Sequence, residues 1–396
     1  MWGANVKKSH LLLVSFLIIF AIVFISNVGP SSMAAAPNKG EILIGCLQDT
    51  TGVTSILGKM IESGAKWAVD EINSQGGIKG RKVKLVSYDT KGEVQEAISA
   101  FTRMVTEDKV SAIIGPPVAN IGIAIAPISE QYNVPILGFA MDNRATIKSN
   151  GQPYKNMFLL QPSSDQQGDI MAHYAVQEKR LKNFGIIYNQ SNAYSLSLVE
   201  AFRRTLKGLN GASIKVEVPY QANDKDFKTL LSKINSAKVD AIYAPNYTQE
   251  LVLIVQQARA IGYAGPIICG LDAAPPFLDL TGPEANGVVY INNITDNDPT
   301  VQEISKEYKE KNRNNPTNKF FLGYDVIHAL TQIIGKVGDN PIKIQKAVEN
   351  LKAYHGVTGD ITINSKTHQT KGLSMYMHEI KDQKNTFIKK YSVPEK

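Results

Sequence analysis

The sequence predicts an α/β protein with two lobes, each built on a doubly wound parallel β-sheet. Short apolar runs alternate with helical patterns along most of the chain, which is typical of layered α/β structure. A second, similar series begins near residue 157, although no sequence repeat accompanies it. At 396 residues the chain is long enough for two hydrophobic cores.

The first series runs from residue 41 to residue 138. A buried strand is expected at 41–48, followed by a loop and by a helix at 58–74 that Gly76 and Gly77 end. The pattern then predicts strands at 82–88, 112–115 and 134–138, separated by helices at 94–106 and 120–132. Strands connected through helices in this way pair in parallel, so their carboxyl ends share one edge of the sheet.

The second series starts with an extended segment at 157–161. Asp165 is then expected to cap a helix that runs to Lys179. Further strands are predicted at 184–188, 214–219, 241–245, 266–270 and 288–291, with helices at 195–208, 226–235 and 249–261. Helices at 300–312, 320–335 and 342–351 follow, and then short antiparallel strands at 360–363, 374–379 and 386–391, of which the last two form a hairpin. The late helices have no sheet of their own, so we expect them to pack on the first lobe.

A candidate ligand site lies within residues 111–144. Ligands collect at the carboxyl ends of parallel strands, and two such ends fall at 116–120 and 140–142. Free backbone N–H groups at the start of the helix at 120–132 offer an anion site. Asp142 adds a carboxylate nearby. One positive and one negative anchor suit a zwitterion.

The net charge indicates no nucleic-acid partner. The chain carries 43 Lys and Arg against 36 Asp and Glu, a formal net charge of +7. The lysines are spread along the chain, without an arginine-rich block or interleaved aromatic residues, which is typical of a solvated surface.

Residues 1–34 are interpreted as a signal peptide. Lys7 and Lys8 precede an apolar run at 11–25, and Ser32 and Ala34 then suit a cleavage site. The run is shorter than the ~20 residues of a membrane span, although an uncleaved anchor stays an alternative. We therefore expect export to a periplasm.

The two cysteines, Cys46 and Cys269, lie far apart in apolar, strand-like runs. An exported protein permits a disulfide, but we expect two separate buried thiols. Residues 43–46 resemble a lipid-attachment box, yet they fall inside the first expected strand, so we interpret the match as coincidence.

The sequence contains no recognisable catalytic constellation. It lacks a Gly-x-Ser-x-Gly elbow and a His-Glu-x-x-His motif, and its six histidines show no metal-binding spacing. Residues 52–59 resemble a phosphate loop, but Met60 stands where Ser or Thr is required. We therefore expect no enzyme, no cofactor and no metal site. A two-lobed protein without catalytic groups is best explained as a binding protein that closes around a small ligand.

Several segments resemble, in the same order, the branched-chain amino-acid-binding proteins of ABC importers. They include EILIGCLQDTTG, DEINSQGGIKGRKV, APISEQYNVPIL, NFGIIYNQSNAYSLSLVEAF, LVLIVQQARAIG and ITDNDPTVQEISKEYKEK. The resemblance covers the chain beyond the leader and implies a type I Venus-flytrap fold with three crossover segments between the lobes, near 161–163, 291–294 and 355–372. It places lobe 1 at 41–161 with 294–358, and lobe 2 at 162–292 with 372–396.

The same resemblance implies a set of ligand contacts. The ligand carboxylate would be held at Ala119 and Asn120, where the hydroxyl usual in the family is missing, and its ammonium by Asp272, one methylene shorter than the family's glutamate. Asp142 and Asp272 would either both face the one ammonium, or one of them would be neutralised by Arg144. The full set of expected contacts is Leu57, Ala119, Asn120, Ala140, Asp142, Tyr194, Tyr247 and Asp272.

The function implied is that of an extracytoplasmic solute-binding protein, a monomer that captures a branched-chain or related amino acid and delivers it to an ABC permease. Two alternatives stay open. One is a ligand-sensing protein that presents its closed form to a receptor, and the other is a binder of an aromatic acid, an amide or another small organic solute. A hydrolase on the same scaffold would need a nucleophile or a metal, and the sequence offers neither.

Overall fold

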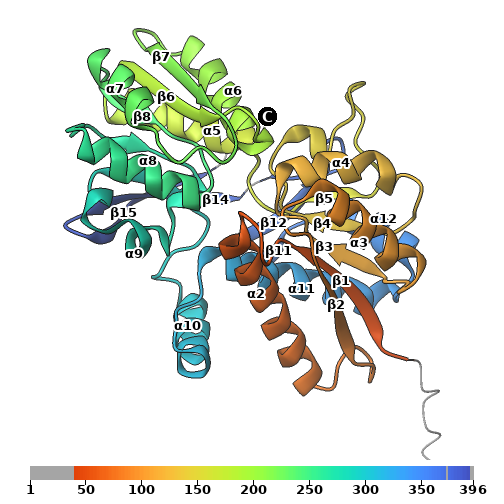
Figure 1. The fold of residues 1–396 in the computed structure, drawn as a ribbon. Helices are drawn as coiled ribbons and strands as arrows, with labels where there is room; N and C mark the ends of the chain where they lie inside the picture. The colour runs from red at the N-terminus through yellow and green to blue at the C-terminus, as the bar shows by residue number, and fades with distance from the viewer. Residues whose placement is uncertain (1–39, 372, 393–396) are drawn as a thin grey trace, which may run out of the picture. The chain divides into compact units, whose positions relative to one another are not determined.

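Two β-sheets organise the chain, as predicted (Figure 1). The computed structural model describes residues 40–371 and 373–392, so the predicted signal peptide lies outside the described residues. The chain passes between the sheets three times, after β5, after β10, and between β13 and β14. This confirms the α/β fold class and the expectation of three crossovers.

The first sheet has, among the described residues, eight strands in the order β11-β12-β13-β5-β4-β3-β1-β2. Strands β1 to β5 are parallel to their neighbours, β13 is parallel to β5, and β12 and β11 are antiparallel. Their bounds are β1 Ile42–Gln48, β2 Val83–Asp89, β3 Ala112–Ile114, β4 Ile136–Gly138, β5 Met157–Leu159, β11 Tyr354–Gly356, β12 Gly359–Asn364 and β13 Gln369–Lys371.

The second sheet has, in the same described part of the chain, seven strands in the order β15-β14-β10-β9-β8-β6-β7. Strands β6 to β10 are parallel, and β14 and β15 form the predicted antiparallel hairpin against β10. Their bounds are β6 Asn183–Asn189, β7 Ser213–Tyr220, β8 Ala241–Tyr243, β9 Ile267–Ile268, β10 Val288–Asn292, β14 Ser374–Lys381 and β15 Lys384–Ser392. We call each sheet with its helices a lobe; the residue bounds of the two lobes stay a prediction.

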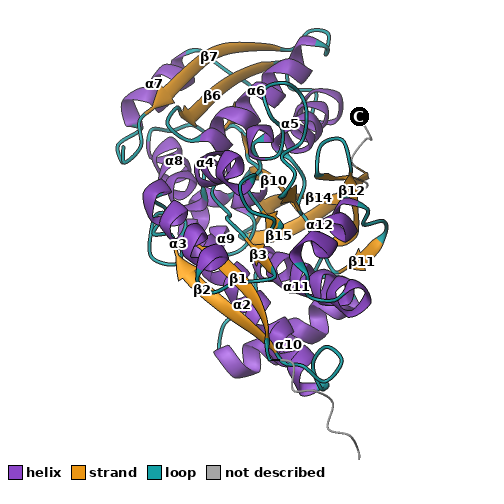
Figure 2. Ribbon diagram, turned by 90° about the vertical axis from the view of Figure 1, so that its right-hand side faces the viewer, coloured by secondary structure: helices purple, strands orange, loops and turns teal. Residues whose placement is uncertain are grey.

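Helices cover both faces of each sheet. On the first sheet, α2 and α11 share one core and α3 and α4 the other; on the second, α5 and α6 lie on one face and α7 and α8 on the other (Figure 2). The bounds are α2 Ser55–Ser74, α3 Val94–Thr106, α4 Ala119–Ser129, α5 Ser164–His173, α6 Ala193–Lys207, α7 Lys228–Ser236, α8 Thr248–Ala260, α9 Phe277–Thr281, α10 Pro299–Asn312, α11 Asn318–Val337 and α12 Pro341–Glu349.

The late helix α11 packs on α2, as expected of a helical block without its own sheet. Two glycines allow the close approach, because a Cβ on Gly64 would overlap the carbonyl oxygen of Phe320, and one on Gly323 would overlap that of Ile61. This contact fixes the position of the N-terminal turn of α11.

The expected cap of α5 is wrong by two residues. Ser163 caps the helix: its hydroxyl accepts from the N–H of Gln166 at 3.3 Å, and the Gln166 side chain accepts from the N–H of Ser163 at 2.8 Å. Such a reciprocal pair satisfies two backbone N–H groups at once and stabilises the start of the helix. Asp165 instead accepts from Arg204 and Asn143. The regular helix ends at His173, and a π-helical turn, Tyr174–Glu178, completes the predicted length.

Candidate functional site

A cavity of about 440 Å³ lies between residues of the two lobes. The first lobe contributes Val53, the β2–α3 loop and the start of α4, and the second contributes the segments that follow β6, β7 and β8. Of the predicted contacts, Asn120 and Tyr247 line this cavity. These segments follow the carboxyl ends of parallel strands, which is where ligands bind in doubly wound sheets.

A second cavity, of about 10 Å³, shares Val53, Tyr247 and Gln249 with the first. Two further predicted contacts, Leu57 and Asp272, line it from opposite lobes. The two cavities therefore adjoin at these three residues, and we call the larger one the outer cavity and the smaller one the inner cavity.

Tyr247 connects the two predicted anchors. The N–H of Ala119, the first residue of α4, donates to its hydroxyl at 3.5 Å. Its ring stacks on that of Tyr194, with centroids 4.8 Å apart and planes 17° apart. Burial, and then the charge of Asp272, raise the pKa of both phenols. Both rings are therefore neutral and can donate a hydrogen bond.

Asp272 is a buried carboxylate that the protein satisfies only in part. It lies in a 3₁₀ turn, Leu271–Ala273, directly after β9, and its side chain is 3% exposed. Its Oδ2 atom has no hydrogen-bond partner among the described residues. A buried carboxylate oxygen without a partner is costly, so this atom is a candidate contact for a cationic ligand group.

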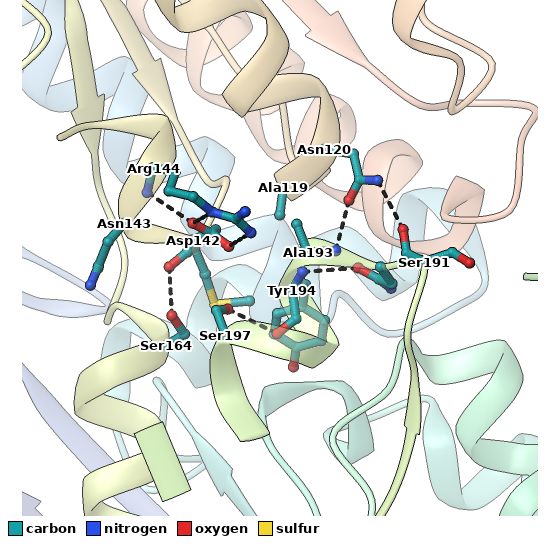
Figure 3. Close-up of polar contacts among 12 residues, drawn as sticks. Ala119, Asn120, Asp142, Asn143, Arg144, Ser164, Ser191, Ala193, Tyr194 and Ser197 are labelled. Carbon is teal, nitrogen blue, oxygen red and sulfur yellow. Dashed lines mark hydrogen bonds and ion pairs between the residues drawn. The ribbon is translucent and has the colours of Figure 1, made fainter. Parts of the chain in front are cut away.

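Asn120 bonds across the two lobes (Figure 3). Its Oδ1 accepts from the N–H of Ala193 at 2.8 Å, and its Nδ2 donates to the carbonyl of Ser191 at 3.1 Å. The side chain therefore satisfies backbone groups at the start of α6. The N–H of Ala119 already donates to the Tyr247 hydroxyl, so the anion anchor at Ala119 and Asn120 stays a prediction.

Asp142 is neutralised by Arg144, which was one of the two alternatives (Figure 3). The guanidinium donates through Nε at 3.0 Å and through a terminal nitrogen at 2.7 Å, and the N–H of Arg144 donates at 2.8 Å. These bonds raise the pKa of Arg144. Neither Asp142 nor Ala140 lines the two cavities, although both are buried. Their role as ligand contacts stays a prediction.

Sequence reasoning missed Glu250, which lines the outer cavity. It lies three residues after Tyr247, so the two share one face of the first turn of α8, a spacing that could have signalled it. Its Oε1 accepts from Asn189 at 2.7 Å, and its Oε2 has no partner among the described residues. Burial raises its pKa.

The two cysteines are free and buried, as expected. Burial raises the pKa of Cys46 to about 12, so its thiol stays protonated and unreactive. Within residues 40–371 and 373–392, no cluster of three or more His, Cys, Asp or Glu side chains could hold a metal ion, and no helix is long and apolar enough to cross a membrane.

The fold and the site define a class: a two-lobed α/β binding protein with its site between the lobes. Residues 41–385 match the model of a family described as periplasmic binding protein, and the chain belongs to this family. The members of the family bind solutes and are not enzymes, so membership confirms that the protein is no enzyme.

Among curated proteins, the chain is 28% identical over 347 residues to the Leu/Ile/Val-binding protein BraC3 of Rhizobium johnstonii, covering 85% of this chain and 93% of that one. It is 24% identical to a leucine-, isoleucine-, valine-, threonine- and alanine-binding protein of Pseudomonas aeruginosa, covering 88% of this chain and 91% of the relative. These relatives support the predicted resemblance to Leu/Ile/Val-binding proteins.

Solved structures of similar fold include proteins named for the same ligands. A leucine-binding protein of Thermotoga maritima superposes with a TM-score of 0.80 at 27% identity, covering 89% of this chain and 99% of that one. A branched-chain amino-acid-binding protein of Streptococcus pneumoniae, in complex with isoleucine, gives 0.79 at 26% identity, with 88% and 99% covered. A solute-binding protein of R. palustris in complex with benzoate gives 0.80 at 18% identity, with 89% and 97% covered, and at that identity it shows the fold alone.

Proposed function

We propose that the protein is the exported solute-binding component of an ABC importer and that its ligand is a small α-amino acid. The relatives named for Leu, Ile and Val, and the isoleucine complex of the Streptococcus pneumoniae protein, support an amino-acid ligand. The proposal depends on the position of Tyr247 relative to Ala119 and Asp272. Tyr247 contacts the N–H of Ala119 on one side, and it lines the inner cavity together with the unpartnered carboxylate of Asp272 on the other.

This geometry suits both charges of a zwitterion. The ligand carboxylate would accept from the N–H groups at the start of α4, where the helix dipole favours negative charge. The ammonium would pair with Asp272, and the hydroxyls of Tyr194 and Tyr247 would donate to whichever ligand oxygen lies near them. Exclusion of water between the lobes strengthens these charge-assisted bonds.

Closure would create the surface that a permease recognises. Asn120 bonds the start of α4 to the start of α6 only when the two lobes are together, so it favours the closed form. Two-lobed binding proteins of this kind work by hinged closure around the ligand. The protein would act in the periplasm as a monomer. In its closed form it would deliver the amino acid to the permease subunits in the membrane.

A ligand panel tests the proposal. The purified protein is titrated calorimetrically with leucine, isoleucine, glutamine and glutamate, with benzoate as an acid that lacks an ammonium, and its thermal unfolding is followed with each. A ligand at 100 times its Kd should stabilise the fold by about 2.7 kcal/mol. Binding of benzoate without binding of any amino acid would refute the amino-acid ligand and favour the aromatic-acid alternative.

A second experiment addresses export. N-terminal sequencing of the protein recovered from a periplasmic fraction should begin after Ala34. A mature chain that retains residues 1–34 in the membrane fraction would show an uncleaved anchor instead.

A further inference from the structure

Lys319 is a buried lysine that the proposed mechanism leaves unused. It is the second residue of α11, and it is 7% exposed. Its backbone N–H donates to Thr317 Oγ1 at 3.2 Å. Among the described residues, its ammonium has no hydrogen-bond partner and no carboxylate oxygen within 4.0 Å, and the ammonium nitrogen is not one of the fully enclosed polar atoms. Lysine is almost never buried without a partner, so this charge requires an explanation.

The backbone that carries Lys319 is held in place. Thr317 caps α11, and the next residue after the lysine, Phe320, contacts Gly64 of α2 through its carbonyl oxygen. Phe320 is fully buried against Trp67 and Tyr308. The lysine therefore cannot reach solvent by a shift of the helix end without loss of this packing.

The surroundings of Lys319 lead to the predicted site. Asn318, its neighbour in α11, donates through Nδ2 to Oδ1 of Asn293 at 3.1 Å. Asn293 follows β10, and β10 packs on the 3₁₀ turn that carries Asp272. Among the described residues, Asp272 is also the charged group that acts on Lys319: burial lowers the pKa of the lysine, and the carboxylate opposes that effect. A lysine of the first lobe and an aspartate of the second thus share one interior region.

This region is rich in polar atoms that the protein leaves unsatisfied. Among the described residues, Oδ2 of Asp272, Nδ2 of Asn293 and Oδ1 of Asn318 are all buried without a hydrogen-bond partner. Buried polar atoms are nearly always paired in folded proteins. Their concentration beside Lys319 points to a ligand with several polar groups, because an aliphatic side chain would leave each of them unpaired.

We propose that the ligand carries a second carboxylate, which pairs with Lys319, so that the protein prefers an acidic α-amino acid over an aliphatic one. The inference rests on the proposed function and deepens it. The α-carboxylate takes the start of α4, and the α-ammonium takes Asp272, which then no longer compensates the charge of Lys319. A further anion on the ligand takes over that role. An apolar side chain there would leave a desolvated charge without a partner, which is costly.

The outer cavity also contains acidic residues, which could repel a ligand with a second carboxylate, but their negative charge is weakened. Glu93 and Asp224 are exposed and line the outer cavity, where solvent screens them. Oε1 of Glu250 is held by Asn189, and burial raises the pKa of Glu250, which weakens its negative charge. Lys319, in contrast, is 7% exposed and lines neither cavity, and the charged group that acts on it is Asp272.

The test compares glutamate with its neutral isostere glutamine and with leucine, by calorimetric titration of the wild type and of Lys319→Met. Methionine keeps the length and apolar stem of lysine and removes the charge. Lys336→Met serves as the control, because Lys336 lies in the same helix and is exposed. We expect the wild type to bind glutamate roughly tenfold or more tighter than glutamine, and Lys319→Met to abolish or reverse this preference, while Lys336→Met retains it.

The outcomes separate the two proposals. If the wild type binds leucine or glutamine best, or if Lys319→Met leaves the glutamate-to-glutamine ratio unchanged, the second-carboxylate assignment is overturned and amino-acid binding stands. An equal loss of all three ligands in a folded Lys319→Met variant also overturns it, because Lys319 would then hold the common α-carboxylate. If the wild type binds none of the three, the second-carboxylate assignment is overturned, and amino-acid binding itself is refuted if the protein binds benzoate and no amino acid. Thermal unfolding verifies that the variant is folded, since loss of a buried, unpaired charge should not destabilise it.

Discussion

Asn120 Oδ1 accepts a 2.8 Å hydrogen bond from the backbone N–H of Ala193, and this bond connects the starts of two helices from different lobes. The same side chain donates to the carbonyl of Ser191 at 3.1 Å. The hinged opening proposed above would break both bonds. In that proposal Asn120 acts on the closing equilibrium, and ligand affinity depends on that equilibrium in turn.

We accordingly expect Asn120→Ala to weaken ligand binding. Two lost hydrogen bonds of about 1 kcal/mol each would raise Kd by roughly tenfold to thirtyfold. Calorimetric titration measures the loss, and small-angle scattering of the free protein should show a more open average form. Asn150→Ala is the matched control, because Asn150 is exposed and its side chain accepts a local hydrogen bond from the N–H of Gln152. Equal affinities of Asn120→Ala and the wild type would contradict the role of Asn120 in closure.

Asp272→Asn should reduce the affinity for an amino acid more strongly. The substitution keeps the shape of the side chain and removes the charge that would pair with the ligand ammonium. Truncation of one partner of a buried charge pair costs about 2–5 kcal/mol, so Kd should rise at least thirtyfold. Asp279→Asn is the control, since Asp279 is an exposed acidic residue of α9. Unchanged binding in Asp272→Asn would remove this residue from the site.

The scaffold was predictable because strands buried on both faces leave a signal in the sequence itself. The run Ile42–Gln48 is apolar almost throughout and forms β1, and the short segments before Tyr247 and Asp272 are strands for the same reason. The resemblance to branched-chain amino-acid-binding proteins pointed to both residues, and their positions after strand ends agree with the rule that ligands bind there.

The orientation of Arg144 and the burial of Lys319 depend on tertiary packing and could not be predicted from the sequence. Arg144 could have pointed to solvent or to Asp142, and only the 3₁₀ turn at Asn143–Ala145 brings the guanidinium onto that carboxylate. Lysine near a helix start is usually exposed, so nothing local marked Lys319 as buried. Its burial follows from the contact of α11 with α2, whose glycines, Gly64 and Gly323, lie far apart in the chain.

The contact between α2 and α11 gives a stability prediction. Gly64→Ala would place a Cβ against the carbonyl oxygen of Phe320, which is backbone and cannot move aside alone. Overpacking of this kind costs typically about 1–3 kcal/mol, so the variant should unfold at a lower temperature and lower denaturant concentration than the wild type. Gly335→Ala is the control, because Gly335 lies in α11 with its nearest neighbour 3.9 Å from the added Cβ. There the helix propensity of alanine should leave stability unchanged or raise it by up to about 1 kcal/mol. Equal stability of the two variants would contradict the close approach of α2 and α11.

We expect the free energy of unfolding to depend on pH in acid partly through Asp89, which bonds to the loop after β1. Asp89 accepts from the N–H groups of Thr50 at 2.8 Å and Lys91 at 2.9 Å, and from the hydroxyl of Thr51 at 2.5 Å. Burial alone would raise its pKa, but these hydrogen bonds outweigh it and lower the pKa from 3.8 to about 2. Because the folded-state pKa lies below the unfolded one, the charged carboxylate stabilises the fold above the unfolded pKa, and this contribution is lost as the pH falls from about 5 to about 2.

Asp89→Asn should therefore be less stable than the wild type at neutral pH, and the difference should shrink as the pH falls through this window. Thermal unfolding followed at closely spaced pH values measures the two profiles. Asp70→Asn, at an exposed position of α2, should run parallel to the wild type throughout. A gap between Asp89→Asn and the wild type that stays constant down to the lowest pH would show that the asparagine fails for reasons of shape, and that the charge of Asp89 does not stabilise the loop.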